Sequence, residues 1–264
     1  MIDLHSLRDE AAVLVRQAGA RIAASAVSPV HEKEGHYNYV TELDVAIQEF
    51  LRGGLSRLLP ESVFFSEEQE NAPMTDAYTW VVDPLDGTYN FIRSRRASAV
   101  SVALLKEKTP VLGLVYQPYH DELFTAVRGE GAFLNGMPVH VSRNPFGKAL
   151  TAIGTSPYYA ELADATTFCF REFLKQGGDI RRVGSAAVDC CDVACGRADV
   201  FCELRLSPWD FAAGALLITE AGGFFMMPYN ERLDFSRPAC ILASNAECRE
   251  QALRIVMLAK ELIG

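Results

Sequence analysis

The sequence predicts a mixed fold, with an N-terminal α+β half followed by a C-terminal α/β half. Helical periodicity continues to about Pro60 and then gives way to short strands joined by tight turns. Beyond the Ser142–Pro145 segment, strand and helix patterns alternate, which is typical of α/β proteins. We therefore divide the chain into residues 1–145 and 146–264.

Two amphipathic helices are predicted at the start of the N-terminal half. Apolar residues recur at helical spacing from Leu4, and Ser28-Pro29 ends this first helix. Thr41 is placed to cap a second helix that runs to about Pro60. Asp44 stands three residues after Thr41, as a capping box requires, and this box explains both residues.

Strand patterns follow from Val63 onward. The N-terminal half contains the strand-like segments VFFSEE, YTWVVDP, SAVSVALL, VLGLVYQPY and ELFTAV. Short polar or Pro/Gly turns join several of them, so Ser98–Val141 is predicted to be an antiparallel meander.

The C-terminal half contains further strand and helix patterns. In chain order they are a strand at Leu150–Gly154, a helix at Ala160–Gln176, a strand at Asp179–Val183, a helix that opens at Gly184-Ser185 and closes at Gly196, and a helix that Ser207 caps and Gly222-Gly223 stops. Pro208 suits the first turn of the last helix because its missing N–H would have no partner there.

The composition indicates a well-packed globular protein, since 49% of the residues are hydrophobic and 22% are charged. The first residues carry charges where a signal peptide needs an apolar core, and no apolar run reaches about eighteen residues. A cytoplasmic protein without a membrane partner is therefore expected. The seven cysteines form no zinc-ligand spacing and are expected to be free thiols.

The charge balance argues against a nucleic acid as the main partner. The formal net charge is −9, whereas a phosphate-binding surface needs clustered Lys and Arg. A small anionic substrate would therefore need cations to offset the repulsion, and divalent metals can do so.

The stretch WVVDPLDGTYNF places two carboxylates, Asp83 and Asp86, at the end of an apolar strand. Pro84 fixes its own φ angle and Gly87 permits a tight turn, so both carboxylates can converge with the Leu85 carbonyl between them. Three hard oxygen donors at this spacing suit Mg²⁺. A capped β-turn would have the same composition, and the residue types alone leave both interpretations open.

Further polar groups strengthen the metal hypothesis. Gly87 and Thr88 can begin a short helix through Phe91 whose N–H groups hold a phosphate, and the Thr88 hydroxyl can orient a water. Glu67 and Glu68 end the strand VFFSEE, and Asp210 begins an Ala/Gly-rich helix. Each of these acids alone has an ordinary explanation, as part of a solvated loop or as a charge that complements a helix dipole.

Together, the segments DPLDGTYNF and PWDFAAGALLITEAGG, with GAFLNGMPVHVS between them, resemble the inositol monophosphatase family. This family comprises lithium-sensitive, Mg²⁺-dependent phosphatases of sugar and polyol phosphates. The resemblance extends from about Lys33 to Gly223. It implies a layered αβαβα sandwich of the inositol monophosphatase and fructose-1,6-bisphosphatase type, with the metals between the two halves, and a homodimer.

The resemblance also implies roles for individual residues. Two or three Mg²⁺ ions are expected, and their ligands would be Glu67, Asp83, the Leu85 carbonyl, Asp86 and Asp210. Asp83 would bridge the first and second ions. Thr88, with Glu67, would activate the attacking water, so the catalytic residues would be Glu67, Asp83 and Thr88. The phosphate would be released directly, without a covalent phosphoenzyme.

The substrate side rests on the same resemblance. The residues expected to contact substrate are Asp86, Gly87, Thr88, Gly184, Ser185, Ala186, Glu203 and Asp210. Glu203 falls where inositol-cleaving members bind a hydroxyl, which favours inositol 1-phosphate as the substrate. The alternatives are 3′-phosphoadenosine 5′-phosphate, fructose 1,6-bisphosphate and histidinol phosphate. A hypothesis of another class is a non-catalytic scaffold that regulates a partner.

Two departures from the family pattern stand out. Ser66 replaces the Gly that usually precedes the metal-binding Glu. The basic loop with Arg93, Arg95 and Arg96 replaces a segment with His, Gly, Pro and aromatic residues. These arginines would read a second phosphate if they faced the site; otherwise they belong to a solvated loop or a subunit contact.

Overall fold

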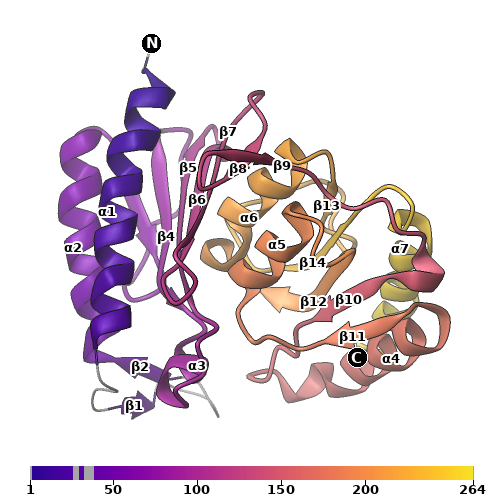
Figure 1. The fold of residues 1–264 in the computed structure, drawn as a ribbon. Helices are drawn as coiled ribbons and strands as arrows, with labels where there is room; N and C mark the ends of the chain where they lie inside the picture. Colours follow the sequence, from indigo (N-terminus) through magenta and orange to yellow (C-terminus); the bar gives the residue numbers. More distant parts are fainter. Residues whose placement is uncertain (1, 26–29, 33–38, 264) are drawn as a thin grey trace.

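The structure is a computed structural model that describes residues 2–25, 30–32 and 39–263 (Figure 1). Ser28 and Pro29, predicted to end the first helix, and Lys33, where the family resemblance begins, lie outside the described residues.

Both predicted N-terminal helices are present. Helix α1 spans Leu4–Ala24, and α2 spans Glu42–Leu58. The Thr41–Asp44 capping box at the start of α2 is confirmed, since the Thr41 N–H donates to Asp44 Oδ2 over 2.9 Å. The two helices lie side by side over one face of a large sheet (Figure 1).

That sheet has seven strands within the described part of the chain. In sheet order they are β3 (Val63–Ser66), β4 (Thr79–Asp86), β5 (Ala99–Lys106), β6 (Thr109–Gln117), β7 (Glu122–Val127), β8 (Ala132–Leu134) and β9 (Met137–Val139). β3 is parallel to β4, and every later neighbour is antiparallel, so the predicted meander is confirmed. The short strands β1 (Val30–Glu32) and β2 (Tyr39–Thr41) form a separate antiparallel pair.

The end of β4 differs from the sequence-based interpretation. The strand does not end at Asp83 but continues to Asp86, with a register shift in which Asp83 pairs with Ser101 and Asp86 with Ala99. Two residues of β4 therefore lie where β5 has one, which defines a β-bulge. Pro84 suits the bulge because it has no N–H to contribute to the ladder. The turn comes later, at Gly87, with φ of 85°.

The C-terminal half builds a second sheet. Its described strands, in sheet order, are β11 (Asp179–Arg181), β10 (Leu150–Ile153), β12 (Val200–Leu206), β14 (Ala239–Ser244) and β13 (Phe224–Met226). Its helices are α4 (Ala163–Gln176), α5 (Ala186–Ala194), α6 (Pro208–Glu220) and α7 (Arg249–Ala259). The predicted helix at Ala160 starts instead as a 3₁₀ turn, Ala160–Leu162, before α4. The sequence-based assignment contained neither β12 nor any element after Gly223.

The elements stack in five layers, so the predicted αβαβα sandwich is confirmed (Figure 1). Helices α1 and α2 pack on the outer face of the seven-stranded sheet, α5 and α6 fill the space between the sheets, and α4 and α7 cover the far face of the five-stranded sheet. The division of the chain into residues 1–145 and 146–264 stays a prediction.

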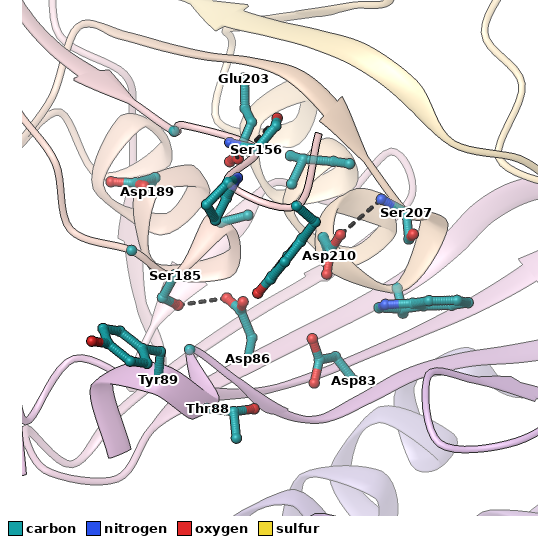
Figure 2. A pocket seen from close by; sticks show the side chains of 18 of the residues that line it. Asp83, Asp86, Thr88, Tyr89, Ser156, Ser185, Asp189, Glu203, Ser207 and Asp210 are labelled. Carbon is teal, nitrogen blue, oxygen red and sulfur yellow. Dashed lines mark hydrogen bonds between the residues drawn. The ribbon is translucent and has the colours of Figure 1, made fainter. Parts of the chain in front are cut away.

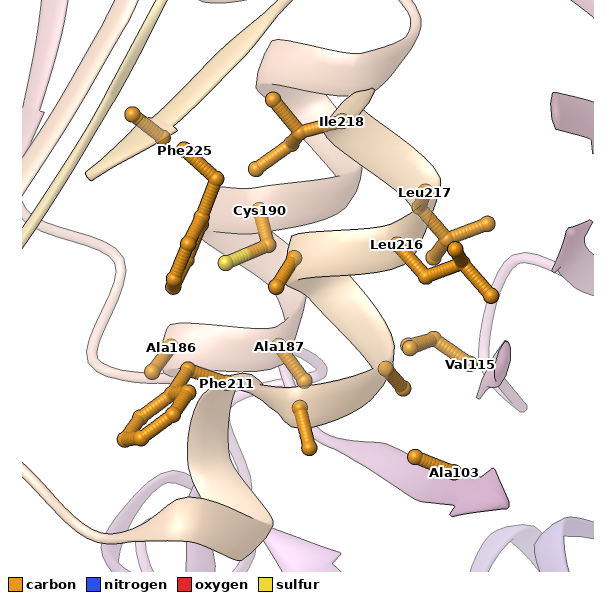
Figure 3. Packing of buried hydrophobic residues seen from close by; sticks show 14 of the residues in the cluster. Ala103, Val115, Ala186, Ala187, Cys190, Phe211, Leu216, Leu217, Ile218 and Phe225 are labelled. Atoms are coloured by element: carbon orange, nitrogen blue, oxygen red, sulfur yellow. The ribbon is translucent and has the colours of Figure 1, made fainter. Parts of the chain in front are cut away.

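Small residues let the central layer pack closely. A Cβ on Gly214 of α6 would lie 2.4 Å from the Cys190 Cβ on α5, and one on Gly113 of β6 would lie 2.9 Å from the Ala213 carbonyl. Helix α6 also buries Phe211, Leu217 and Ile218 in the core between the sheets (Figure 3). This packing holds the N-terminus of α5 and the first turn of α6 in fixed positions between the sheets.

All seven cysteines are free, as predicted. Among the described helices, none is long and apolar enough to cross a membrane.

Candidate active site

A pocket of about 550 Å³ opens between the two sheets, within the range of about 300–1,000 Å³ usual for small-molecule sites. From the N-terminal half, the end of β4 and helix α3 (Thr88–Ile92) line it. From the C-terminal half, the loop after β10, the start of α5, the end of β12 and the start of α6 line it. Neither half alone encloses this space.

Three carboxylates converge at one end of this pocket (Figure 2). Asp83, Asp86 and Asp210 each offer an oxygen, and these oxygens lie within 4.8 Å of one another. The β4 bulge carries the first two, and Asp210 comes from the first turn of α6. The structure therefore brings together acids separated by more than a hundred residues in the chain.

Each carboxylate is oriented by donors from its surroundings. The Leu85 N–H donates to Asp83 Oδ1 over 2.9 Å, and the Ser207 N–H donates to Asp210 Oδ2 over 2.7 Å. Asp86 Oδ2 accepts from the Ser185 hydroxyl and from the Ala187 N–H, so it is bound to the N-terminus of α5.

The electrostatics of this cluster call for a counter-charge. Burial, together with the neighbouring Glu67, Asp86 and Asp210 carboxylates, raises the pKa of Asp83 well above its usual range. Burial also raises the pKa of Asp86 to about 6 and that of Asp210 well above normal. Of the three carboxylates in the cluster, Asp83 and Asp86 are buried, whereas Asp210 is partly exposed. Converging acids in a low-dielectric site fit a divalent cation, which removes the repulsion.

The donor set fits Mg²⁺. All three side chains offer hard oxygen atoms, and the site is open enough for the waters that Mg²⁺ retains. The Leu85 carbonyl, a further expected ligand, lies 3.0 Å from the Thr88 hydroxyl, and its two lone pairs leave it able to bind a metal as well.

Glu67 lines the same pocket but stands outside the cluster of three. It is an electrostatic neighbour of Asp83, Asp86 and Asp210, whose pKa values it raises. The preceding Ser66 is fully buried, and its hydroxyl donates to the Val82 carbonyl over 2.9 Å. This bond ties the end of β3 to the residue before Asp83, a role that Gly could not perform.

Thr88 has a partner that the sequence-based interpretation missed. Its hydroxyl lies 3.1 Å from Asp44 Oδ1 and 3.0 Å from the Leu85 carbonyl. Asp44 is 1% exposed. Its Oδ2 accepts the Thr41 N–H and its Oδ1 lies against Thr88, so one buried carboxylate contacts both the α2 cap and the candidate site. The Thr41–Asp44 spacing is visible in the sequence, but a capping box explains it fully, so the spacing alone does not reveal the contact with Thr88.

The expected substrate residues all line the pocket. Gly184, Ser185 and Ala186 form the turn into α5, and Gly184 has φ of 90°. Glu203 lies at the other end of the pocket from Asp83, close against the Gly154 backbone, where a Cβ would meet its Oε2 at 1.8 Å (Figure 2).

Glu203 is held by Ser156, which the sequence did not single out. The Ser156 N–H donates to Glu203 Oε1 over 2.7 Å, and its hydroxyl lies 3.3 Å from the same oxygen. Burial raises the pKa of Glu203 to about 7, and the bond from Ser156 opposes this shift. No local pattern marks Ser156, because its partner lies 47 residues away.

The basic loop does not contribute to the pocket. Arg93, Arg95 and Arg96 are exposed, and none is among the described residues that line it. The lining arginines are Arg182 and Arg205 instead. The three arginines therefore do not line the space in which a second phosphate would bind at this pocket.

Comparisons with known proteins agree with this geometry. The model of the inositol monophosphatase family matches residues 3–260. Inositol monophosphatase 3 of Solanum lycopersicum is 39% identical over 254 residues, covering 93% of this chain and 94% of that protein. The Nus factor SuhB of Escherichia coli strain K12 is 38% identical over 229 residues, covering 83% of this chain and 84% of that protein.

Solved structures show the same fold. The extragenic suppressor protein suhB from Bartonella henselae superposes with a TM-score of 0.87 at 32% identity, covering 95% of this chain and 98% of that one. An IMPase/NADP phosphatase, solved with Mg²⁺ and phosphate, gives a TM-score of 0.83 at 25% identity, covering 96% and 94%. From the matched length, the shared fold and the acidic cluster, we conclude that this chain belongs to the inositol monophosphatase family.

Proposed function

We propose that this protein is a Mg²⁺-dependent phosphomonoester hydrolase that converts inositol 1-phosphate and water into inositol and phosphate. The family and the curated relatives indicate a phosphatase. The observation that carries the proposal is the convergence of Asp83, Asp86 and Asp210 oxygens within 4.8 Å in a pocket that also contains Thr88 and Glu203.

The metal ligands in this proposal are Glu67, Asp83, the Leu85 carbonyl, Asp86 and Asp210, holding two or three ions. A solved relative contains Mg²⁺ and phosphate, which supports this choice of cofactor. Bound Mg²⁺ supplies Lewis acidity to the attacking water and to the departing alkoxide.

Thr88 is proposed to align the attacking water. If its hydroxyl hydrogen points at Asp44 Oδ1, 3.1 Å away, an oxygen lone pair is left to accept a hydrogen bond from the attacking water. Glu67 is proposed to share the deprotonation. The water oxygen forms a bond to phosphorus as the bond from phosphorus to the inositol oxygen breaks. The inositol oxygen takes up one proton, which balances the proton that the water gives up. The backbone N–H groups of Gly87 and Thr88 are proposed to hold the phosphate.

The pocket lining favours a hydroxyl-rich substrate over a bisphosphate. Glu203 would repel a second phosphate, and the nearby Arg182 guanidinium acts as its counter-charge, opposing the raised pKa of Glu203. Arg205 stacks over the Tyr159 ring, 4.4 Å from its centroid. The basic-loop residues Arg93, Arg95 and Arg96 do not line the pocket.

A substrate panel tests this proposal. With Mg²⁺, inositol 1-phosphate should give the highest kcat/KM among inositol 1-phosphate, histidinol phosphate, fructose 1,6-bisphosphate and 3′-phosphoadenosine 5′-phosphate. EDTA should abolish turnover, and Li⁺ should inhibit it. If another substrate of the panel exceeds inositol 1-phosphate by about a hundredfold, or about 2.7 kcal/mol of transition-state binding, the substrate assignment is wrong.

The second candidate is a regulatory scaffold, which the similarity to a protein named Nus factor SuhB favours. The complete acidic cluster argues for an enzyme, since a pure scaffold has no use for buried carboxylates that repel one another. Absence of Mg²⁺-dependent phosphate release from every monoester would instead support the scaffold. A homodimer and a cytoplasmic location stay predictions; the mass in solution tests the first.

A further inference from the structure

Asp189 is a buried acid in the pocket lining for which neither the fold nor the metal cluster accounts. It lies in the first turns of α5, where its N–H donates to the Ser185 carbonyl over 3.0 Å. Its side chain is 1% exposed, and within the described part of the chain its Oδ1 has no hydrogen-bond partner.

This arrangement costs stability. Burying a carboxyl oxygen without a partner is unfavourable, and the cost is higher when the group is charged. Burial and the Glu203, Asp192 and Asp86 carboxylates raise the pKa of Asp189 well above its usual range, and the Arg182 guanidinium opposes this shift. A purely structural acid would be expected to have its oxygen paired.

The position of Asp189 indicates what the oxygen serves. Figure 2 places Asp189, Ser156 and Glu203 at the end of the pocket away from Asp83. We call these three residues the distal end. Asp189 comes from α5, Glu203 from β12 and Ser156 from the loop after β10, so three separate segments bring polar groups to one place.

We propose that Asp189 is a specificity residue that hydrogen-bonds a ring hydroxyl of the substrate at the distal end, beside Glu203. This inference rests on the proposed phosphatase function, because it places the phosphate near Asp83 and the ring beyond Ser185. A ring hydroxyl can donate to the Asp189 carboxylate, which supplies a partner that the protein withholds.

The charge pattern selects the class of ligand. Two acids at the distal end disfavour a second phosphate. Arg182, whose guanidinium offsets both acids, also donates to Thr155 Oγ1 over 2.9 Å. Neutral hydroxyls avoid the repulsion and still satisfy the carboxyl oxygens. The distal end therefore suits a polyol ring rather than a sugar or nucleoside bisphosphate.

The test compares two substrates on the full chain with Mg²⁺: myo-inositol 1-phosphate, and phenyl phosphate, whose ring has no free hydroxyl. Asp189→Ala should raise KM for the inositol ester about tenfold, the effect of one hydrogen bond, with kcat within about twofold. Both constants for phenyl phosphate should stay within about twofold. Asp189→Asn, which keeps an acceptor, should lie between wild type and Asp189→Ala.

Stability separates this role from a structural one. Removing an unpaired buried carboxyl should leave the Tm of Asp189→Ala equal to or above that of wild type. Asp192→Ala changes an acid on the same helix that is absent from the pocket lining, and it should leave both KM values unchanged. An unchanged KM for the inositol ester in Asp189→Ala, or equal losses on both substrates with a lowered Tm, would overturn the inference.

A binding measurement keeps this inference separate from the proposed function. If wild type hydrolyses neither ester, the proposed function fails. Calorimetry with myo-inositol still tests Asp189, because the ring alone should bind wild type about tenfold more tightly than Asp189→Ala. Equal affinities, or no binding to either protein, would sink the specificity role.

Discussion

Asp83 is a single residue whose proposed role in the reaction comes at the expense of stability. It is 1% exposed, and three other acids raise its pKa. Asp83→Asn keeps an oxygen to accept the Leu85 N–H but removes the charge that the metal needs. Removing a hydrogen-bond partner of a metal ligand typically lowers activity about 10- to 100-fold. We expect kcat of Asp83→Asn to fall by more than this, because the ligand itself is changed. The Tm in EDTA should not fall, because the mutual repulsion is relieved.

The matched control for this change is Asp164→Asn, which neutralises an exposed carboxylate in the first turn of α4. It should leave kcat and its dependence on Mg²⁺ unchanged. Near-normal turnover by Asp83→Asn would remove Asp83 from the metal site, and with it the proposed bridging of two ions.

At the scale of elements, the junction between β4 and α3 depends on Gly87. Its φ of 85° is strained for a residue with a side chain, and a Cβ there would lie 2.9 Å from the Ala97 carbonyl. Gly87→Ala should therefore destabilise the protein by about 1–3 kcal/mol. It should also lower kcat, since Asp86 and Thr88 flank the displaced residue. Chemical denaturation and steady-state kinetics measure the two effects.

Two other glycines separate the causes of that loss. Gly129 has φ of 82° but open space around a Cβ, so Gly129→Ala should show backbone strain alone. Gly147 has open space and no such φ, so Gly147→Ala should be nearly neutral. If Gly87→Ala costs no more than Gly129→Ala and keeps full kcat, close packing at this junction is not required.

At the scale of the whole molecule, the buried acids couple stability to pH and metal. Asp86, with a pKa of about 6, and Glu203, with a pKa of about 7, are raised above unfolded values near 4. The stability they contribute is fully present below about pH 4 and is lost as the pH rises through about 6 to 7. In EDTA, these groups should therefore lower the Tm between pH 5.5 and 8.

Mg²⁺ should restore the Tm at pH 8, where the acids are charged. It should raise the Tm less at pH 5.5. Exposed acids with lowered pKa values act in the opposite direction. One example is Asp121, whose pKa is lowered by its hydrogen bonds with Tyr116 and Arg16. The difference between melting curves in Mg²⁺ and in EDTA therefore isolates the metal site. An Mg²⁺ effect that is equal at both pH values would contradict this account.

Much of the fold was predictable because its signals are local. Periodicity and turn residues found α1, α2, the meander strands and the caps of α5 and α6, all of which depend on neighbouring residues. The β4 bulge was missed because pairing with β5 decides it. Strand β12, which carries Glu203, was missed although its signal is local, since Glu203 and Arg205 alternate with apolar residues as is typical of a strand.

The sequence by itself determined the family and the acids at Asp83 and Asp86, since short segments and their spacing contain that information. The family resemblance also implied Asp210, and the tertiary structure brings its oxygen within 4.8 Å of theirs. Only the tertiary structure decided that Asp44 contacts Thr88 and that the basic loop lies outside the pocket. It also decided the distal end, where Asp189 and Glu203 line one pocket. These are contacts between segments far apart in the chain, and the packing of α5 and α6 between two sheets creates them.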